Sequence, residues 1–197
     1  VEPAEVTREQ LLRVHDAAYL DDLGRIVPED GYRDIDMDTR MNSKTLRAAR
    51  FAAGAAVRAI DEVLAGRATN AFCSVRPPGH HATRNRAMGF CFYNNAAIGA
   101  AHAIAAHGLE RLAVIDFVVH YGNGTDATFA GDGRVHLFSL YEQGLYQLDD
   151  PIGDYIPELA ELEVRIAEDQ HGMRTEPANA PITIKDLFCH TSGFTYG

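Results

Sequence analysis

Short apolar runs alternate with longer segments of helical periodicity along most of the chain. From Leu46 to Leu64 the apolar residues recur at spacings of three and four, which predicts a long helix. Ser43 is the expected N-cap of this helix, and Gly66 is expected to end it. A first helix is expected over residues 7–23, with Thr7 as its N-cap. A third should begin at Asn94 or Asn95, and it is apolar on nearly every side, so it should be buried.

Three short runs rich in β-branched residues, at residues 69–75, 111–117 and 135–140, are too brief for helices. They predict buried parallel strands. A short helix is expected near residues 125–130, between the second strand and the third. Because strands and helices alternate, the pattern predicts an α/β fold with a parallel sheet flanked by helices and right-handed crossovers.

Polar side chains follow two of these strands. Asp116 and His120 come at the carboxyl end of the second strand, and His80 and His81 follow the first strand after a rigid Pro-Pro-Gly turn. Ligands of open parallel sheets bind just outside the carboxyl ends of the strands. A lone histidine would more often be satisfied by backbone groups at a turn, but the adjacent pair favours a functional site.

Three motifs carry a family resemblance: Arg-Pro-Pro-Gly-His-His-Ala at 76–82, Gly-Phe-Cys-Phe-Tyr-Asn-Asn at 89–95, and Ile-Asp-Phe-Val-Val-His-Tyr-Gly-Asn-Gly-Thr at 115–125. Together they resemble the zinc-dependent histone deacetylase and acetylpolyamine amidohydrolase family. The resemblance spans roughly residues 7–146 and implies a truncated arginase/deacetylase fold. It also implies a hydrolase that acts on a small acylated substrate, either an acetylated amine or a simple acyl ester.

The resemblance assigns catalytic roles to four residues. It implies that one histidine of the pair is the general base for a metal-bound water, and that the other stabilises or protonates the leaving group. His80 would be oriented by Asp116 and His81 by Asn123, since a carboxylate or amide partner fixes the tautomer of an imidazole.

Gly89 and Phe90 are the expected substrate-binding residues, because Phe90 corresponds to an aromatic wall of the family's acyl-lysine channel. An aromatic residue after a glycine is more commonly part of the core, and both interpretations can hold.

The implied metal sites differ in how well this sequence supports them. The family has Asp-x-Asp-x-His where this chain has Asp116-Phe-Val118-Val-His120, so one zinc ligand is replaced by valine and His120 alone remains. A catalytic zinc takes three protein ligands, so tight zinc binding is not expected. A potassium site is better supported: the resemblance implies ligands from the Asp116 side chain, the carbonyls around Val118 and His120, the Ser139 hydroxyl and the Leu140 carbonyl.

Composition narrows the possible partners. The net charge of -10 over 197 residues disfavours binding to nucleic acid or to an anionic membrane, and a cationic ligand would suit the chain better. An acidic loop contains Asp30, Asp34, Asp36 and Asp38, although such loops are usually solvated surface.

Three cysteines without Cys-x-x-Cys spacing indicate a reducing, cytoplasmic compartment. No apolar run is long enough to cross a bilayer.

The sequence changes character after residue 146, so we expect domains at 1–146 and 147–197. Residues 148–159 and 181–193 resemble class C β-lactamases and penicillin-binding esterases. The family's nucleophilic Ser-x-x-Lys occurs nowhere in the chain, and Ser192 is expected in a helix-ending turn. This appendage is predicted to be mainly helical, with one helix through Leu159, Leu162 and Ile166 and a second, capped by Thr183, through Ile184, Leu187 and Phe188.

Three functions stay open at this point. The first is a deacetylase-type hydrolase that acts through His80 and His81. The second is an inactive fused fragment with a structural role, expected to be a homo-oligomer because half a parallel sheet leaves apolar surface exposed. The third, a serine esterase of the β-lactamase type, is disfavoured by the missing Ser-x-x-Lys.

Overall fold

A computed structural model describes residues 2–139, 149–155, 157, 160–161, 163–169, 172–178 and 180–188. The chain forms two compact units, Val1–Ser139 and Leu140–Gly197, and each is described by itself. The domain boundary expected at residues 146 and 147 falls outside the described residues and stays a prediction.

Two short helices, α1 (Arg8–Leu12) and α2 (Ala17–Arg25), replace the single helix predicted at the start of the chain. The expected cap is present: Thr7 Oγ1 accepts from the Gln10 amide, and Gln10 Oε1 accepts from the Thr7 amide. The helix breaks at His15 because this side chain is buried and makes long-range hydrogen bonds. Its Nδ1 donates to the Thr83 carbonyl at 2.9 Å, and its Nε2 accepts from the Asn94 amide at 3.0 Å.

The long helix α3 (Thr45–Leu64) forms as predicted, but its N-cap is Lys44 and not Ser43. Asn42 and Thr45 exchange hydrogen bonds across this turn instead. An antiparallel pair of short strands, β1 (Arg33–Asp34) and β2 (Arg40–Met41), precedes the helix.

The prediction of a strand at residues 69–75 is wrong. This segment forms no strand in the described part of the chain, and Phe72 in its middle is almost fully exposed. A strand requires a neighbour to take its backbone hydrogen bonds, and the described part of the chain supplies none here.

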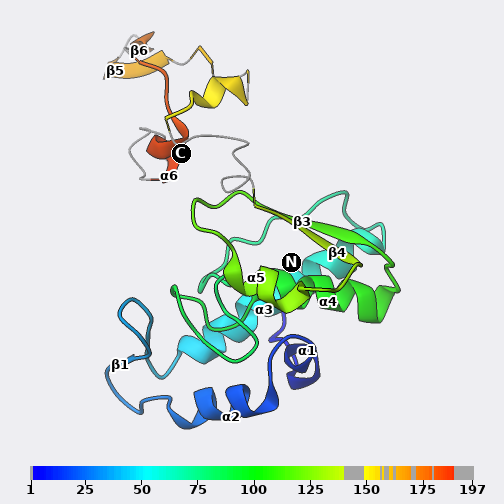
Figure 1. The fold of residues 1–197 in the computed structure, drawn as a ribbon. Helices are drawn as coiled ribbons and strands as arrows, with labels where there is room; N and C mark the ends of the chain where they lie inside the picture. Colours follow the sequence, from blue (N-terminus) through cyan, green and yellow to red (C-terminus); the bar gives the residue numbers. More distant parts are fainter. Residues whose placement is uncertain are drawn as a thin grey trace. The chain divides into compact units, whose positions relative to one another are not determined.

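Helix α4 (Asn95–His107) matches its prediction closely. Asn94 caps it by accepting a hydrogen bond from the Ala97 amide, and Gly108 ends it in the left-handed conformation with φ 68°. Gly99 lets α4 pack closely on α3, since a Cβ there would lie 3.1 Å from Ile60 Cδ1 (Figure 1).

The parallel sheet consists of β3 (Leu112–Asp116) and β4 (Val135–Ser139) in the described residues. The register pairs Leu112 with Val135 and ends by pairing Asp116 with Ser139. Helix α5 (Asn123–Phe129) connects the two strands (Figure 1). This strand-helix-strand unit is the arrangement predicted from the sequence, and it places the end of β3 beside the start of α5.

The core of the first unit lies among its helices and the 87–93 segment. Its largest fully buried side chains include Phe92, Met41, Ile98, His15, Val14 and Asn94. By contrast, the strands leave apolar side chains exposed: Ile115 is 61% exposed and Phe138 is 42% exposed.

The second unit contains a 3-10 turn η1 (Ile152–Asp154), an antiparallel hairpin of β5 (Glu163–Asp169) and β6 (Gly172–Pro177), and a helix α6 (Ile184–Phe188). The prediction of a helix around Ile166 is wrong, because Ile166 lies in β5. Leu159 and Leu162, which were expected in the same helix, are outside the described residues. The second expected helix is confirmed, and Thr183 Oγ1 accepts from the Asp186 amide at its start.

Among the described residues, no helix is both long enough and apolar enough to span a membrane.

Candidate active site

Two adjacent imidazoles form the centre of the site. His80 Nδ1 donates to Asp116 Oδ2 at 2.8 Å, and His81 Nδ1 donates to Asn123 Oδ1 at 2.7 Å. The ring centroids of the two histidines are 4.0 Å apart. Because each Nδ1 carries the hydrogen, each Nε2 presents a lone pair in the neutral state. The structure therefore brings together the four residues predicted to be catalytic, with the pairing that the resemblance implies.

Backbone hydrogen bonds hold the turn that carries His80 and His81 against the start of α5. The His80 carbonyl accepts from the amide of Gly124 at 2.9 Å and from that of Thr125 at 3.2 Å. Behind the turn, the buried Asn94 side chain donates to the Ala82 carbonyl and to Thr125 Oγ1. Asn94 therefore joins the turn, α4 and α5 at one point.

Two glycines bring the backbone close to the side chains predicted to be catalytic. A Cβ at Gly122 would lie 2.3 Å from Asp116 Oδ2, and a Cβ at Gly89 would lie 2.4 Å from His81 Cδ2. Gly89 also has a φ of +57°, a backbone angle that residues other than glycine rarely adopt. No larger residue fits at either position without moving His81 or Asp116.

Phe90, expected to bind substrate, has the left-handed backbone conformation with φ 64°. Its amide donates to Thr39 Oγ1 at 3.0 Å, which holds this conformation. A bulky residue with positive φ is uncommon, and such residues cluster at functional sites. The residue is 58% exposed, so the alternative that Phe90 is plain core is wrong.

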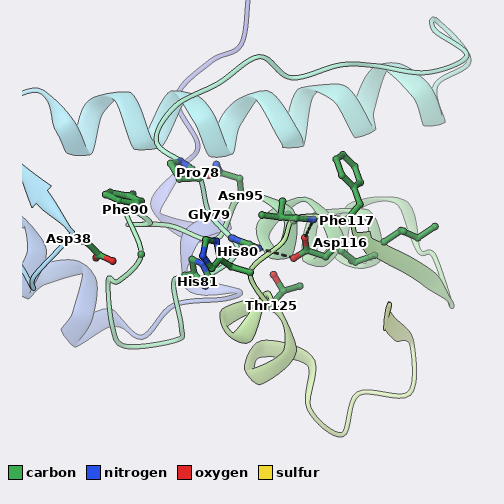
Figure 2. Close-up of a pocket in the computed structure, with 16 residues that line it drawn as sticks. Asp38, Pro78, Gly79, His80, His81, Phe90, Asn95, Asp116, Phe117 and Thr125 are labelled. Atoms are coloured by element: carbon green, nitrogen blue, oxygen red, sulfur yellow. Dashed lines mark hydrogen bonds and ion pairs between the residues drawn. The ribbon is translucent and has the colours of Figure 1, made fainter. Parts of the chain in front are cut away.

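The histidines open onto a cavity of about 540 Å³. Figure 2 shows His80 and His81 at its centre, with Asp38 and Phe90 on one side and Asp116 and Phe117 on the other. Its other lining residues are Pro78, Gly79, Gly89, Asn95, Ala96, Val114, Ile115, Val118, His120 and Thr125. The sequence pointed to Asp38 only as one of four acidic loop residues, because its approach to the site depends on long-range contacts such as that between Thr39 and Phe90.

Burial lowers the pKa of His81, against the hydrogen bond to Asn123, and the neighbouring imidazoles of His80 and His120 act in the same direction as burial. A lowered pKa keeps His81 neutral near pH 7, as a general base requires. In contrast, burial raises the pKa of the nearby Cys91 thiol to about 11. Cys91 is therefore protonated at neutral pH and is not a nucleophile.

The residues present do not fit the zinc centre that the resemblance implies. His120 is in the cavity, with its ring centroid 6.0 Å from that of His81, but Val118 provides no ligand atom. In the described residues, the one group of three metal-ligating side chains close enough to share an ion lies elsewhere, at Asp61, His102 and His107.

The predicted potassium ligands fit better as far as the structure describes them. Ser139 pairs with Asp116 across the sheet, and its buried Oγ has no hydrogen-bond partner among the described residues. A buried polar atom without a partner is costly unless an ion or water satisfies it. Leu140 lies outside the described residues.

Sequence comparisons identify the family. The model of the histone deacetylase domain matches residues 1–155. The chain belongs to the histone deacetylase family. A histone deacetylase-like amidohydrolase of Pseudomonas aeruginosa is 43% identical over 138 residues, which cover 70% of this chain and 36% of that protein. The human polyamine deacetylase HDAC10 is 48% identical over 104 residues, 52% of this chain and 16% of that protein.

The fold comparison agrees as well. The crystal structure of the HDA15 HD domain matches with a TM-score of 0.65 and 37% sequence identity, over 71% of this chain and 39% of that domain's chain. This histone deacetylase family member therefore has the arginase/deacetylase α/β fold in part. It spans less than half the length of each of these three relatives.

The C-terminal segment matches a different family. A β-lactamase family model matches residues 137–197, in agreement with the resemblance of the two tail motifs. Ser192, at which the alternative serine-hydrolase chemistry would be tested, lies outside the described residues. The two matches overlap at residues 137–155, immediately around the end of β4.

Proposed function

We propose that this histone deacetylase family member hydrolyses acetylated amines or simple acyl esters, using His80 and His81 as its acid–base pair. The observation that carries the proposal is the orientation of the two rings. Each Nδ1 donates to a fixed partner, Asp116 or Asn123, so both Nε2 atoms are available for proton transfer.

The two partners favour different tasks for the two rings. His81 has a neutral partner and a lowered pKa, so it accepts a proton from the attacking water at Nε2. His80 has the carboxylate of Asp116 as its partner, and we assign to this ring the task of assisting departure of the amine or alcohol. Water adds to the acyl carbon, the bond to the leaving group breaks, and the products are a carboxylic acid and an amine or alcohol.

The cavity supports an acylated, cationic substrate. Phe90, Phe117 and Ile115 supply apolar walls for an alkyl chain, and Asp38 supplies a negative charge on the side of Phe90. The net charge of -10 favours the same class of ligand. We propose a cytoplasmic enzyme, with potassium beside Asp116 and Ser139 as its structural ion.

The inactive fragment is a second candidate, and one observation favours it. Zinc-dependent hydrolysis takes three protein ligands, whereas Val118 removes one ligand and His120 is the single imidazole available beyond the pair. We propose that activity without the metal is low, and that the apolar surface of the β3–β4 pair then supports self-association.

The test measures turnover of p-nitrophenyl acetate and of acetyl-lysine by His80→Ala, His81→Ala and Ser192→Ala. General acid–base groups contribute about 10²–10⁴-fold to rate, so each histidine variant should lose activity on this scale. His136→Ala is the matched control, because His136 is an exposed histidine on β4. Loss of activity in Ser192→Ala alone would transfer the function to the serine-esterase alternative, and equal rates in all variants would favour the inactive fragment.

A further inference from the structure

A second cluster of metal-ligating side chains lies on helices α3 and α4, with no residue in common with the histidine pair. Asp61 belongs to α3, and His102 and His107 belong to the second half of α4. His102 Nε2 lies 2.8 Å from Asp61 Oδ1, and His107 Nε2 lies 2.7 Å from the same oxygen. The three ligand atoms all lie within 4.8 Å of one another.

We propose that Asp61, His102 and His107 form a binding site for a divalent transition-metal ion such as Zn²⁺ or Co²⁺, whose occupancy Arg13 opposes. Two imidazoles and one carboxylate are a donor set suited to such ions, and three protein ligands leave a fourth position for water. His107 is the last residue of α4, where the helix dipole also favours positive charge.

The hydrogen bonds define what the ion must displace. A carboxylate is acceptor-only, so both Nε2 atoms carry hydrogens that point at Asp61 Oδ1. For each ring to ligate through Nε2, its hydrogen must move to Nδ1. Metal–nitrogen bonds of about 2.0–2.1 Å would also require the three ligand atoms to rearrange around the ion, which the exposed end of α4 permits because His107 is partly exposed.

Arg13 is the obstacle to this tautomer change at His102. Its NH1 lies 3.1 Å from His102 Nδ1, and a guanidinium can only donate. His102 is therefore fixed with its hydrogen on Nε2, whereas a ligating histidine normally donates its other N–H to an acceptor. Arg13 must turn away before the ion binds, and its second partner, Glu9 at 3.1 Å, is an exposed ion pair that stabilises it only weakly.

The experiment titrates the chelator-treated full chain with Co²⁺, followed by the visible absorption of the bound ion and by competition with Zn²⁺. We expect one ion per chain with micromolar affinity. His107→Gln should abolish binding, and because this side chain is partly exposed the variant should fold. His120→Gln, in the cavity of the histidine pair, is the matched control and should bind the ion unchanged.

A gain-of-affinity variant tests the role of Arg13 separately. Arg13→Gln places an amide oxygen where it can accept from His102 Nδ1, so binding should tighten by about 10–100-fold, the size of typical effects of such supporting partners. Adding His107→Gln to this variant should remove the gain.

Three results would overturn the proposal: no Co²⁺ binding by the wild type up to millimolar concentration, binding lost in His120→Gln but kept in His107→Gln, or no gain in Arg13→Gln. Because none of these readouts is an activity, they are independent of whether the histidine pair is catalytic.

Discussion

The Nδ1 atom of His81 lies 2.7 Å from Oδ1 of Asn123, so a neutral amide and not a carboxylate orients this ring. Burial lowers the pKa of His81 in this setting. His80, by contrast, has the carboxylate of Asp116 as its partner. The two neighbouring rings therefore differ in the charge of the side chain that accepts the hydrogen bond from Nδ1.

Replacing Asn123 by aspartate should shift the pH dependence of hydrolysis. The new carboxylate would stabilise protonated His81 and raise its pKa. Because His81 acts as a base only when neutral, the rate falls as pH falls through this pKa, so the acidic limb of the pH–rate profile should move to higher pH. Asn123→Ala is the control, and it should reduce the rate without this upward movement. An acidic limb at the same pH in Asn123→Asp would contradict the role given to His81.

The cavity of His80 and His81 should hold well under one tightly bound zinc per chain, because Val118 stands where a ligand is needed. Val118→Asp should raise zinc affinity at the histidine cavity, while Val118→Thr, of similar size, should not. Both should be made in a His107→Gln background so that Asp61 and His102 do not contribute. Elemental analysis after dialysis against a mild chelator checks this, and one zinc retained per chain by His107→Gln alone would show that the ligand argument is wrong.

The chain is expected to self-associate through the exposed apolar side chains of β3 and β4. Ile115 is 61% exposed and is paired in register with Phe138, 42% exposed, so the two form adjoining apolar surface. A two-fold contact is the commonest way to bury such a surface. Light scattering after size exclusion should give a mass above the 21.6 kDa of one chain, and Ile115→Glu should reduce it.

Met37 provides the comparison, because it is fully exposed on the loop between β1 and β2. Met37→Glu should leave the mass unchanged. A sharp 21.6 kDa peak from the wild type, without binding of a hydrophobic dye, would end the oligomer hypothesis.

The stability of the fold should depend on His15 below neutral pH. Burial lowers the pKa of His15 from 6.5 to about 4. Between these values the unfolded chain binds a proton that the folded chain does not, so the free energy of unfolding decreases as pH falls from 6.5 towards 4. The loss should be on the order of 3 kcal/mol. Urea titrations across this range check it, and His15→Gln should flatten the dependence.

The central part of the fold was predictable because its signals are local. Asn94, Gly108 and the apolar run before Asp116 define a helix, its end and a strand without reference to distant residues. The partners of His80 and His81 followed from the family resemblance, which the spacing of three motifs carries.

The errors arose where distant contacts decide the structure. His15 ends a helix because its ring bonds to Thr83 and Asn94, which are far away in sequence. Residues 69–75 have the composition of a strand, yet strand formation depends on a pairing neighbour. Around Ile166 the apolar residues fit either the helical or the strand periodicity. The segment forms a strand because it pairs with the antiparallel strand β6.

The buried Asn94 side chain also sets how the active site can move. It bonds to Ala82, Thr125 and the first turn of α4, so these segments should open together as one cooperative unit, with hydrogen-exchange protection lost at the same rate in all of them. All the members of this unit precede residue 126, whereas the change of sequence character comes after β4. We therefore expect the local stability of the histidine pair to depend on hydrogen bonds within the deacetylase-like segment alone.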